Sequence, residues 1–302
     1  MLDVALMVEG QNGLTWERWQ RIAETVEDAG FAGLYRSDHF TNPNPPDIDS
    51  LELWVSLTWL ASHTRRIEFG PLVAPVSFRH PVLMARMASA IDDLSNGRLT
   101  LGLGAGWQER EHTNFGFELL DVPQRFARFE EGLEVTHRLL IGDEPVTFEG
   151  TYYQLHDAIL LPRPRRPGGP PILIGGNGPR RTLPLVARFA REWNAVFINA
   201  ETFAERNALL DDLLREQDRQ PGDVRRSLMT GVVFGRDDAE VQRKLDGRNI
   251  DELRGRGLIV GTAEAVVEQI GRLSDAGVQR VMLQWLDLDD LDGIEALAKA
   301  VV

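Results

Sequence analysis

The chain has 302 residues, of which 43% are hydrophobic and 26% charged, so it contains enough apolar sequence to bury a sizeable globular core. Its formal net charge of -13 argues against general nucleic-acid binding, which relies on a basic surface. Because it has no cysteine, disulfides, thiolate metal sites and cysteine nucleophiles are excluded. No segment approaches the roughly 18 apolar residues of a membrane span, and residues 1–10 predict a strand and not a signal peptide. We expect a cytoplasmic protein that does not bind membranes.

Short apolar runs alternate with amphipathic segments along the whole chain. We expect strands at residues 3–8, 33–37, 67–73, 99–104, 172–175, 194–198, 228–234 and 280–285. We expect helices at residues 15–29, 51–63, 81–95, 123–140, 179–191, 201–219, 237–247 and 262–276. This alternation predicts an α/β fold, a (β/α)8 TIM barrel forming a single domain over residues 1–302. An open doubly wound sheet is the alternative.

One long segment departs from this rhythm, at residues 142–171. Residues 147–155 resemble two short strands about a Glu-Gly turn, and a basic, proline-rich linker follows at residues 162–171. We interpret the segment as an insertion in the barrel. A weaker interruption lies at residues 248–261.

The second expected strand ends abruptly in Ser37, Asp38, His39 and Phe40. Parallel α/β enzymes present reactive groups at the carboxyl ends of their strands, so an acid and an imidazole here indicate a site. The alternative is structural, with Asp38 capping the next turn and His39 packing as a partly buried residue.

Glycine-rich turns follow two further strands. Gly104, Ala105 and Gly106 allow close approach of a flat ligand, although such a turn is more often only a tight bend. The loop from Gly175 to Gly178 precedes a helix and offers free amides to an anion. The charged run 109–112 is either a solvated helical turn or part of the site. It lacks a third ligand, so we expect no metal.

Four runs together resemble the bacterial luciferase-like flavin and deazaflavin oxidoreductases, and within them the branch that uses coenzyme F420. They are Ser37-Asp38-His39-Phe40, the segment 70–81, the segment 94–107 with its Gly104-Ala105-Gly106-Trp107 end, and Pro171-Ile172-Leu173-Ile174-Gly175-Gly176-Asn177-Gly178. The resemblance covers almost the whole chain and implies the TIM-barrel fold. The choice between F420 and FMN rests on much less specific features.

The resemblance also implies roles for individual residues. Asp38 would contact the edge of the deazaflavin ring, and His39 would lie by its reacting face. A non-proline cis peptide at Leu72-Val73 would form a bulge behind the ring. The turn Gly104-Ala105-Gly106 would lie beside the ring, and Gly176, Asn177 and Gly178 would hold the cofactor phosphate with their amides.

Sugar-phosphate dehydrogenases of this superfamily carry a catalytic Glu where this chain has Trp107, which argues against sugar-phosphate oxidation. We therefore expect a reductase that passes a hydride from F420 to a small organic substrate. His39 is the leading proton donor, with Glu111 and His112 as weaker candidates. The expected substrate pocket contains Glu9, Gln11, Asn12, Phe40 and Trp107, each of which could equally be a loop residue.

Two other functions stay open, an FMN-dependent two-component monooxygenase and an inactive flavin- or deazaflavin-binding barrel. The expected partner is a small-molecule substrate. A homodimer is also possible, through apolar residues of the early helices such as Trp54, Leu57 and Trp59, although these could all belong to the core.

Overall fold

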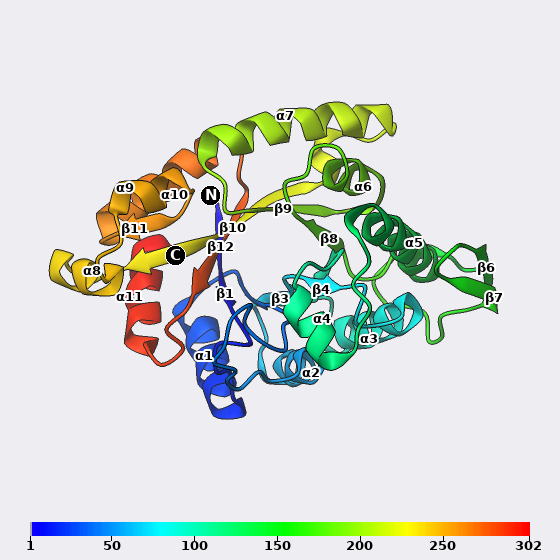
Figure 1. Cartoon of the computed structure of the whole chain (residues 1–302), viewed down its shortest axis with the longest axis horizontal. Coiled ribbons are helices and arrows are strands. Elements are labelled where there is room, and N and C mark those ends of the chain that lie inside the picture. The colour runs from blue at the N-terminus through cyan, green and yellow to red at the C-terminus, as the bar shows by residue number, and fades with distance from the viewer. Residues whose placement is uncertain (1) are drawn as a thin grey trace.

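The computed structural model describes residues 2–302. Its strands are β1 (Asp3–Val8), β2 (Gly33–Arg36), β3 (Glu68–Pro71), β4 (Ala74–Pro75), β5 (Leu101–Gly104), β6 (Val146–Glu149), β7 (Gln154–Ala158), β8 (Ile172–Gly175), β9 (Glu192–Val196), β10 (Arg225–Phe234), β11 (Ile259–Gly261) and β12 (Arg280–Trp285). The main sheet has the order β3-β2-β1-β12-β10-β9-β8-β5-β4, and its neighbouring strands are parallel (Figure 1).

The two ends of this strand order meet, which closes the sheet. Thr100 donates a backbone hydrogen bond to Phe69 at 2.9 Å, and Phe69 donates one to Arg98 at 3.1 Å. Strand β3 is the expected strand at residues 67–73, shortened at both ends, and β4 follows it after Leu72-Val73. The predicted TIM barrel is thus confirmed, and the open doubly wound alternative is wrong.

Helices surround the barrel (Figure 1). They are α1 (Trp16–Ala29), α2 (Leu53–His63), α3 (Pro81–Leu94), α4 (Glu109–Phe115), α5 (Val122–Ile141), α6 (Thr182–Phe189), α7 (Ala200–Glu216), α8 (Asp238–Leu245), α9 (Ile250–Gly255), α10 (Ala263–Asp275) and α11 (Leu291–Val301), with a short 3-10 turn at Pro221–Asp223. Thr15 caps α1, and Gly30 ends it in the left-handed conformation, as the sequence indicated.

Some elements differ from the expected ones. Helix α6 begins three residues late, because residues 179–181 form a turn in which Gly178 accepts the first amides of the helix. Helices α9 and α11 were not expected, and α4 extends the run 109–112, for which a helical turn was one of two interpretations. The predicted hairpin is present as the antiparallel pair β6 and β7, which projects from one side of the barrel in Figure 1.

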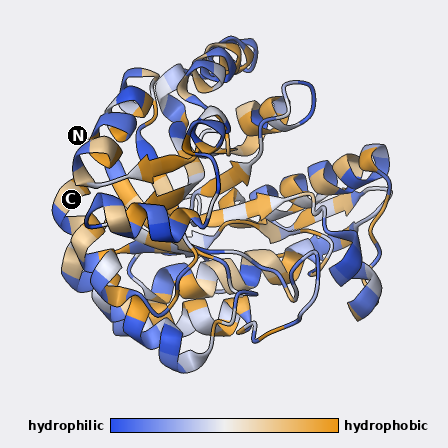
Figure 2. Cartoon of the chain, turned by 60° about the vertical axis from the view of Figure 1, so that its left-hand side comes forward, coloured by the Kyte–Doolittle hydropathy of each residue, from blue (hydrophilic) through white to orange (hydrophobic). Residues whose placement is uncertain are grey.

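Alternate residues of the strands pack on opposite sides of the barrel wall. On β1, Val4, Leu6 and Val8 belong to the large core between barrel and helices, whereas Ala5 and Met7 belong to a small cluster inside the barrel. Strands are accordingly apolar on both faces, and helices are apolar on one side only (Figure 2).

The early helices contribute mainly to this core. Trp54 and Leu57 of α2 are buried, so they do not form the exposed dimer patch that was one of two interpretations. Trp59 is half-buried and packs edge-on against Trp16. Among residues 2–302, no helix is both long and apolar enough to cross a membrane.

Barrel closure generates the first prediction. A Cβ on Gly70 would lie 2.0 Å from the backbone oxygen of Thr100, the residue directly before β5, and a backbone oxygen cannot rotate away as a side chain can. We expect Gly70→Ala to lower the free energy of unfolding by at least about 2 kcal/mol through overpacking. Gly271→Ala is the matched control, because this helical glycine has open space at its Cβ, and the change should stabilise by about 0.5–1 kcal/mol. Chemical denaturation measures both, and equal effects would contradict the closure argument.

Candidate active site

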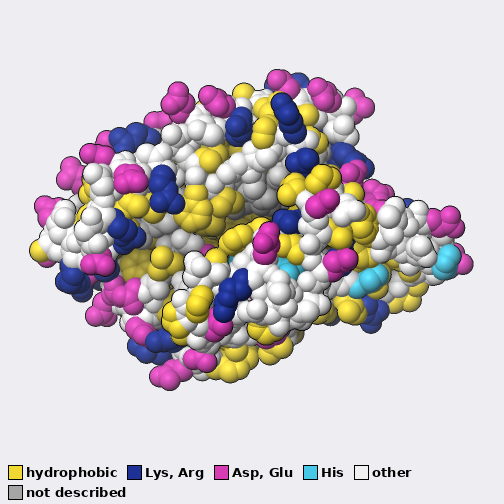
Figure 3. Space-filling view, viewed as in Figure 1, with side chains coloured by type: hydrophobic (Ala, Val, Ile, Leu, Met, Phe, Trp, Pro, Cys, Tyr) yellow, Lys and Arg dark blue, Asp and Glu magenta, His cyan; other side chains and the backbone are white. Residues whose placement is uncertain are grey.

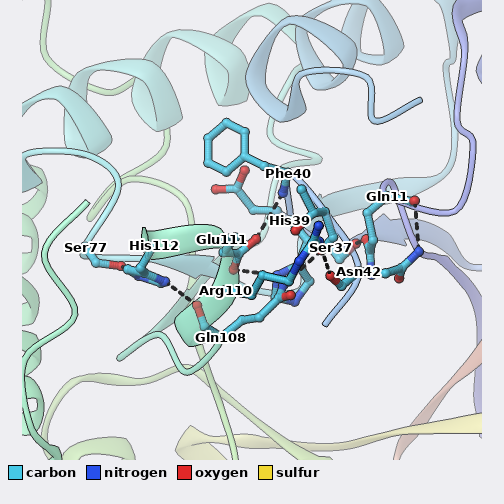
Figure 4. A network of polar contacts seen from close by, with 12 residues as sticks. Gln11, Ser37, His39, Phe40, Asn42, Ser77, Gln108, Arg110, Glu111 and His112 are labelled. Atoms are coloured by element: carbon cyan, nitrogen blue, oxygen red, sulfur yellow. Dashed lines mark hydrogen bonds and ion pairs between the residues drawn. The ribbon is translucent and has the colours of Figure 1, made fainter. Parts of the chain in front are cut away.

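The predicted site residues follow strands whose carboxyl ends lie at the same end of the barrel. Hydrophobic side chains surround a hollow in the middle of the face shown in Figure 3. Polar side chains from the segments after β1, β2, β4 and β5 form a connected network, shown from close by in Figure 4. Parallel topology explains this convergence, because it brings the segments that follow neighbouring strands together.

His39 is held by side chains from the segment after β5 (Figure 4). Its Nδ1 lies 2.9 Å from a carboxylate oxygen of Glu111 and 3.2 Å from Nε2 of Gln108. Glu111 is only 1% exposed. Burial lowers the pKa of the His39 imidazole, but the hydrogen bond and charge of Glu111 outweigh it, so that the pKa is raised above its ordinary value.

Glu111 also fixes the backbone beside His39. Its second carboxylate oxygen accepts a 3.0 Å hydrogen bond from the backbone N–H of Phe40. The preceding residue, Arg110, forms a bidentate pair with Asp47 at 2.7 Å and donates to the backbone oxygen of Asn42. Helix α4 therefore ties down the loop that follows β2.

His112 follows Glu111 on α4 and is buried. Its Nδ1 is 2.7 Å from the backbone oxygen of Gln108, so Nδ1 carries the proton, and its Nε2 is 2.8 Å from the Ser77 hydroxyl. Both ring nitrogens are engaged, which suits a residue that holds α4 against the segment after β4. The interpretation of Glu111 and His112 as solvated helix residues is wrong.

Asp38 is buried and paired with Arg79, whose guanidinium also contacts Glu52 at 2.9 Å. Burial is the largest influence on Asp38 and raises its pKa, although Arg79 opposes the shift. The carboxylate therefore joins the ends of β2 and β4.

The end of β1 contributes a second polar group. Glu9 accepts hydrogen bonds from Gln11 at 2.9 Å and from Gln284, at the end of β12, at 2.5 Å. The amide oxygen of Gln11 accepts a bond from the Ser37 hydroxyl at 2.8 Å. Asn12 is half-buried and closes the turn through its backbone N–H to Glu9. The structure thus brings the expected pocket residues of this loop into contact with the segment that carries His39.

The aromatic members of the expected pocket differ in exposure. Trp107 is 59% exposed, and its ring meets the His39 ring edge-on at 5.6 Å. Phe40 is half-buried and stacks on Phe115 at 4.8 Å, within a cluster that includes Phe78 and Phe117. Trp107 is thus available to a ligand beside His39, whereas Phe40 packs mainly against protein.

The bond Leu72-Val73 is cis, as predicted. The Val73 side chain fills the space beside Gly104 and Gly175. A Cβ added to Gly104 would lie 2.6 Å from this side chain, and a Cβ added to Gly175 would lie 3.1 Å from it. Ala105 and Gly106 follow, both half-buried, and Gly106 has a φ of +83° that favours glycine. Glycine-lined backbone therefore meets Val73 where β4, β5 and β8 end.

The glycine loop after β8 is held by the side chain of Asn177. This amide donates to the backbone oxygen of Val196 at 2.7 Å and accepts from its backbone N–H at 2.9 Å. The amide of Gly176 donates to Asn194 at 2.9 Å. Within residues 2–302, the backbone amides of Asn177 and Gly178 have no protein acceptor, so they are the two amides of the predicted trio that can face an anion.

Several residues of this network were not predicted as site residues, namely Ser77, Arg79, Gln108 and Gln284. Ser77 and Arg79 lie inside the motif run 70–81, and Gln108 directly follows the predicted residue Trp107. Gln284 had a separate signal, since it is a polar residue near the end of an apolar strand.

Comparisons with known proteins agree on the family. The model of the family described as luciferase-like monooxygenase matches residues 4–252. The chain is 34% identical over 201 residues to 4-hydroxyprotoasukamycin monooxygenase of Streptomyces nodosus subsp. asukaensis, covering 67% of this chain and 52% of that protein. It is 34% identical over 158 residues to an F420-dependent glucose-6-phosphate dehydrogenase of Kineococcus radiotolerans, covering 52% of this chain and 46% of that protein. The chain therefore spans about half the length of these relatives.

Among solved structures, an F420-dependent secondary alcohol dehydrogenase in complex with an F420-acetone adduct superposes with a TM-score of 0.88. The two share 19% sequence identity, and the match covers 99% of this chain and 98% of that one. At this identity the likeness establishes the fold.

The Asn177 bonds generate the second prediction. Asn177→Ala removes both hydrogen bonds to Val196 and leaves its backbone groups unpaired, so we expect the free energy of unfolding to fall by about 1–3 kcal/mol. Asn114→Ala, at an exposed position of α4, should change it by less than about 0.5 kcal/mol. Chemical denaturation compares the two variants, and an Asn177→Ala protein as stable as the control would show that the loop does not depend on this side chain.

Proposed function

Because the chain belongs to the luciferase-like monooxygenase family, we propose that it is an oxidoreductase that transfers a hydride between coenzyme F420 and a small organic substrate, acting as a reductase. The observation that carries this proposal is the position of His39, whose ring is fixed by Glu111 beside the exposed Trp107. The F420-dependent names of one close relative and one structural neighbour support the choice of cofactor.

The residues around Val73 fit a flat cofactor with a phosphate group. The bulge at Leu72-Val73, with Gly104 and Gly175 beside it, offers a side-chain-poor floor for a ring. One loop further along the sheet, the free amides of Asn177 and Gly178 suit a phosphate. We propose that these residues hold the cofactor, that Ala105 and Gly106 border its ring and that Asp38 stands at the ring edge.

When held by these residues, F420 would supply a hydride, that is, two electrons and one hydrogen nucleus. The protein binds and orients both molecules. His39 stands beside Trp107 with its Nε2 free of protein partners among residues 2–302, and it gives the proton that completes the reduction. Glu9, Gln11, Asn12 and Trp107 form the substrate side of the site, and Phe40 supports it from within its aromatic cluster.

A second candidate is an FMN-dependent two-component monooxygenase. It is favoured by the relative from Streptomyces nodosus, a monooxygenase whose match covers 67% of this chain. The same floor and the same loop suit FMN, which also carries a phosphate. An inactive cofactor-binding barrel is the third candidate, and the paired His39 and Glu111 count against it. A cytoplasmic location and a homodimer stay predictions.

Cofactor titrations separate these candidates. We expect purified protein to bind F420 at least tenfold more tightly than FMN, read from ligand fluorescence. In Gly178→Asp, a carboxylate stands at the proposed phosphate loop, where a Cβ would already lie 3.0 Å from the Thr182 hydroxyl, and we expect affinity for F420 to fall at least tenfold. Tight binding of FMN with none of F420 would replace this proposal by the monooxygenase.

Loss of His39 tests the proton donor. We expect His39→Ala to lower turnover by roughly 10²–10⁴-fold with little change in F420 affinity, because the phosphate loop is unaltered. His156→Ala, at an exposed position of the β6–β7 hairpin, should leave both unchanged. If His39→Ala weakens F420 binding and leaves turnover of the bound form intact, His39 is a cofactor ligand and the proton comes from elsewhere.

A further inference from the structure

We propose that Glu111 is a positioning residue that keeps the proton of neutral His39 on Nδ1, so that Nε2 is the nitrogen that exchanges protons with a ligand. The catalytic consequence of this inference rests on the proposed function. The position of the proton on His39 does not, because it is a property of the protein without cofactor or substrate. Its basis is the arrangement of donors and acceptors around one ring nitrogen (Figure 4).

Nδ1 of His39 faces two side chains of opposite hydrogen-bonding character. Glu111 offers a carboxylate oxygen at 2.9 Å, which can only accept, and Gln108 offers Nε2 at 3.2 Å, which can only donate. The Gln108 amide cannot be turned round, since its Nε2 also donates to the backbone oxygen of Thr41 at 2.9 Å. Nδ1 must therefore either carry a proton toward Glu111 or accept one from Gln108.

The closer and charged partner decides between these states. A charge-assisted hydrogen bond to a carboxylate is roughly twice as strong as a neutral one, and Glu111 is 1% exposed, so water does not compete for it. If His39 lost this proton, a buried carboxylate oxygen would lose its donor. The proton therefore stays on Nδ1, and Nε2 gains and loses the second proton.

The surroundings of His39 are otherwise acidic. Asp38 after β2 and Glu9 after β1 add to the effect of Glu111, and the cation Arg79 is engaged by Asp38 and Glu52. These acidic groups favour the protonated form of the His39 imidazole and raise its pKa. The stabilisation that this pair gives the fold is present below the ordinary imidazole pKa of about 6.5 and is lost as the pH rises through the raised value.

Glu111→Gln separates position from charge. Glutamine keeps an oxygen for the Phe40 amide and presents a donor to Nδ1, so the two donors around Nδ1 should force the neutral ring to carry its proton on Nε2. We also expect the pKa of His39 to fall, because burial then acts without the opposing charge of Glu111. Glu109→Gln, on the exposed side of α4, is the matched control and should change neither property.

The measurement is long-range ¹H–¹⁵N correlation NMR of [¹⁵N]histidine protein without any cofactor, as a function of pH. The His39 signals are assigned by their loss in His39→Asn. The wild-type spectrum alone tests the tautomer, so the proposal does not depend on the variant folding. Nδ1–H in neutral wild-type His39 is expected, and Nε2–H there would overturn the proposal. A Glu111→Gln protein that folds and keeps both the wild-type tautomer and pKa would overturn it too.

Turnover then tests the link to the reaction. If His39 donates the proton, the pH above which kcat declines should move down in Glu111→Gln by the same amount as the His39 pKa, with KM little changed. Glu111→Asp keeps the charge and should restore most of the wild-type pH profile. An altered NMR spectrum with an unaltered pH profile supports the positioning role and removes His39 from the proposed reaction.

Discussion

The close backbone approach of β3 and β5 is the constraint on which this molecule depends. It is possible because Gly70 and Gly102 have no side chains, and any Cβ there would lie 2.0 Å from a backbone oxygen of the facing strand. This contact turns an open sheet into a closed one. Closure in turn places the segments after β2, β4, β5 and β8 around one mouth, which is why residues distant in sequence meet there.

Rigidity at the mouth comes from charged and amide side chains that join neighbouring loops. Arg79 links the ends of β2 and β4, and Arg110 links α4 to the loop after β2. The Asn177 side chain bonds both the N–H and the C=O of Val196, as a neighbouring strand would. It fixes the glycine loop in this way and leaves the backbone amides of Asn177 and Gly178 free in the part of the chain that the structure describes. A ligand that uses those amides meets a loop already in place, which lowers the ordering cost of binding.

The sequence predicted the barrel well, because continuous apolar runs and capped helices repeat along the chain. The bounds of β1, β8 and β12 agree with the expected ones. Helix α11 was not predicted, although Ile294, Leu297 and Ala298 follow helical spacing. The positions of site residues at strand ends were predictable from topology. Their partners were not, because pairs such as Glu9 with Gln284 depend on the register between the two ends of the chain.

The burial of Glu111 has a further consequence for any cycle in which His39 gives up a proton. With His39 protonated, the imidazolium and the buried Glu111 carboxylate form a pair without net charge. Deprotonation of the ring leaves a net negative charge in a place that water hardly reaches, with the Phe40 amide and the Nδ1 proton as its remaining donors. The state with a neutral His39 is therefore electrostatically the less favourable one. The buried Glu111 carboxylate provides the driving force that returns a proton from solvent to the imidazole before the next substrate binds.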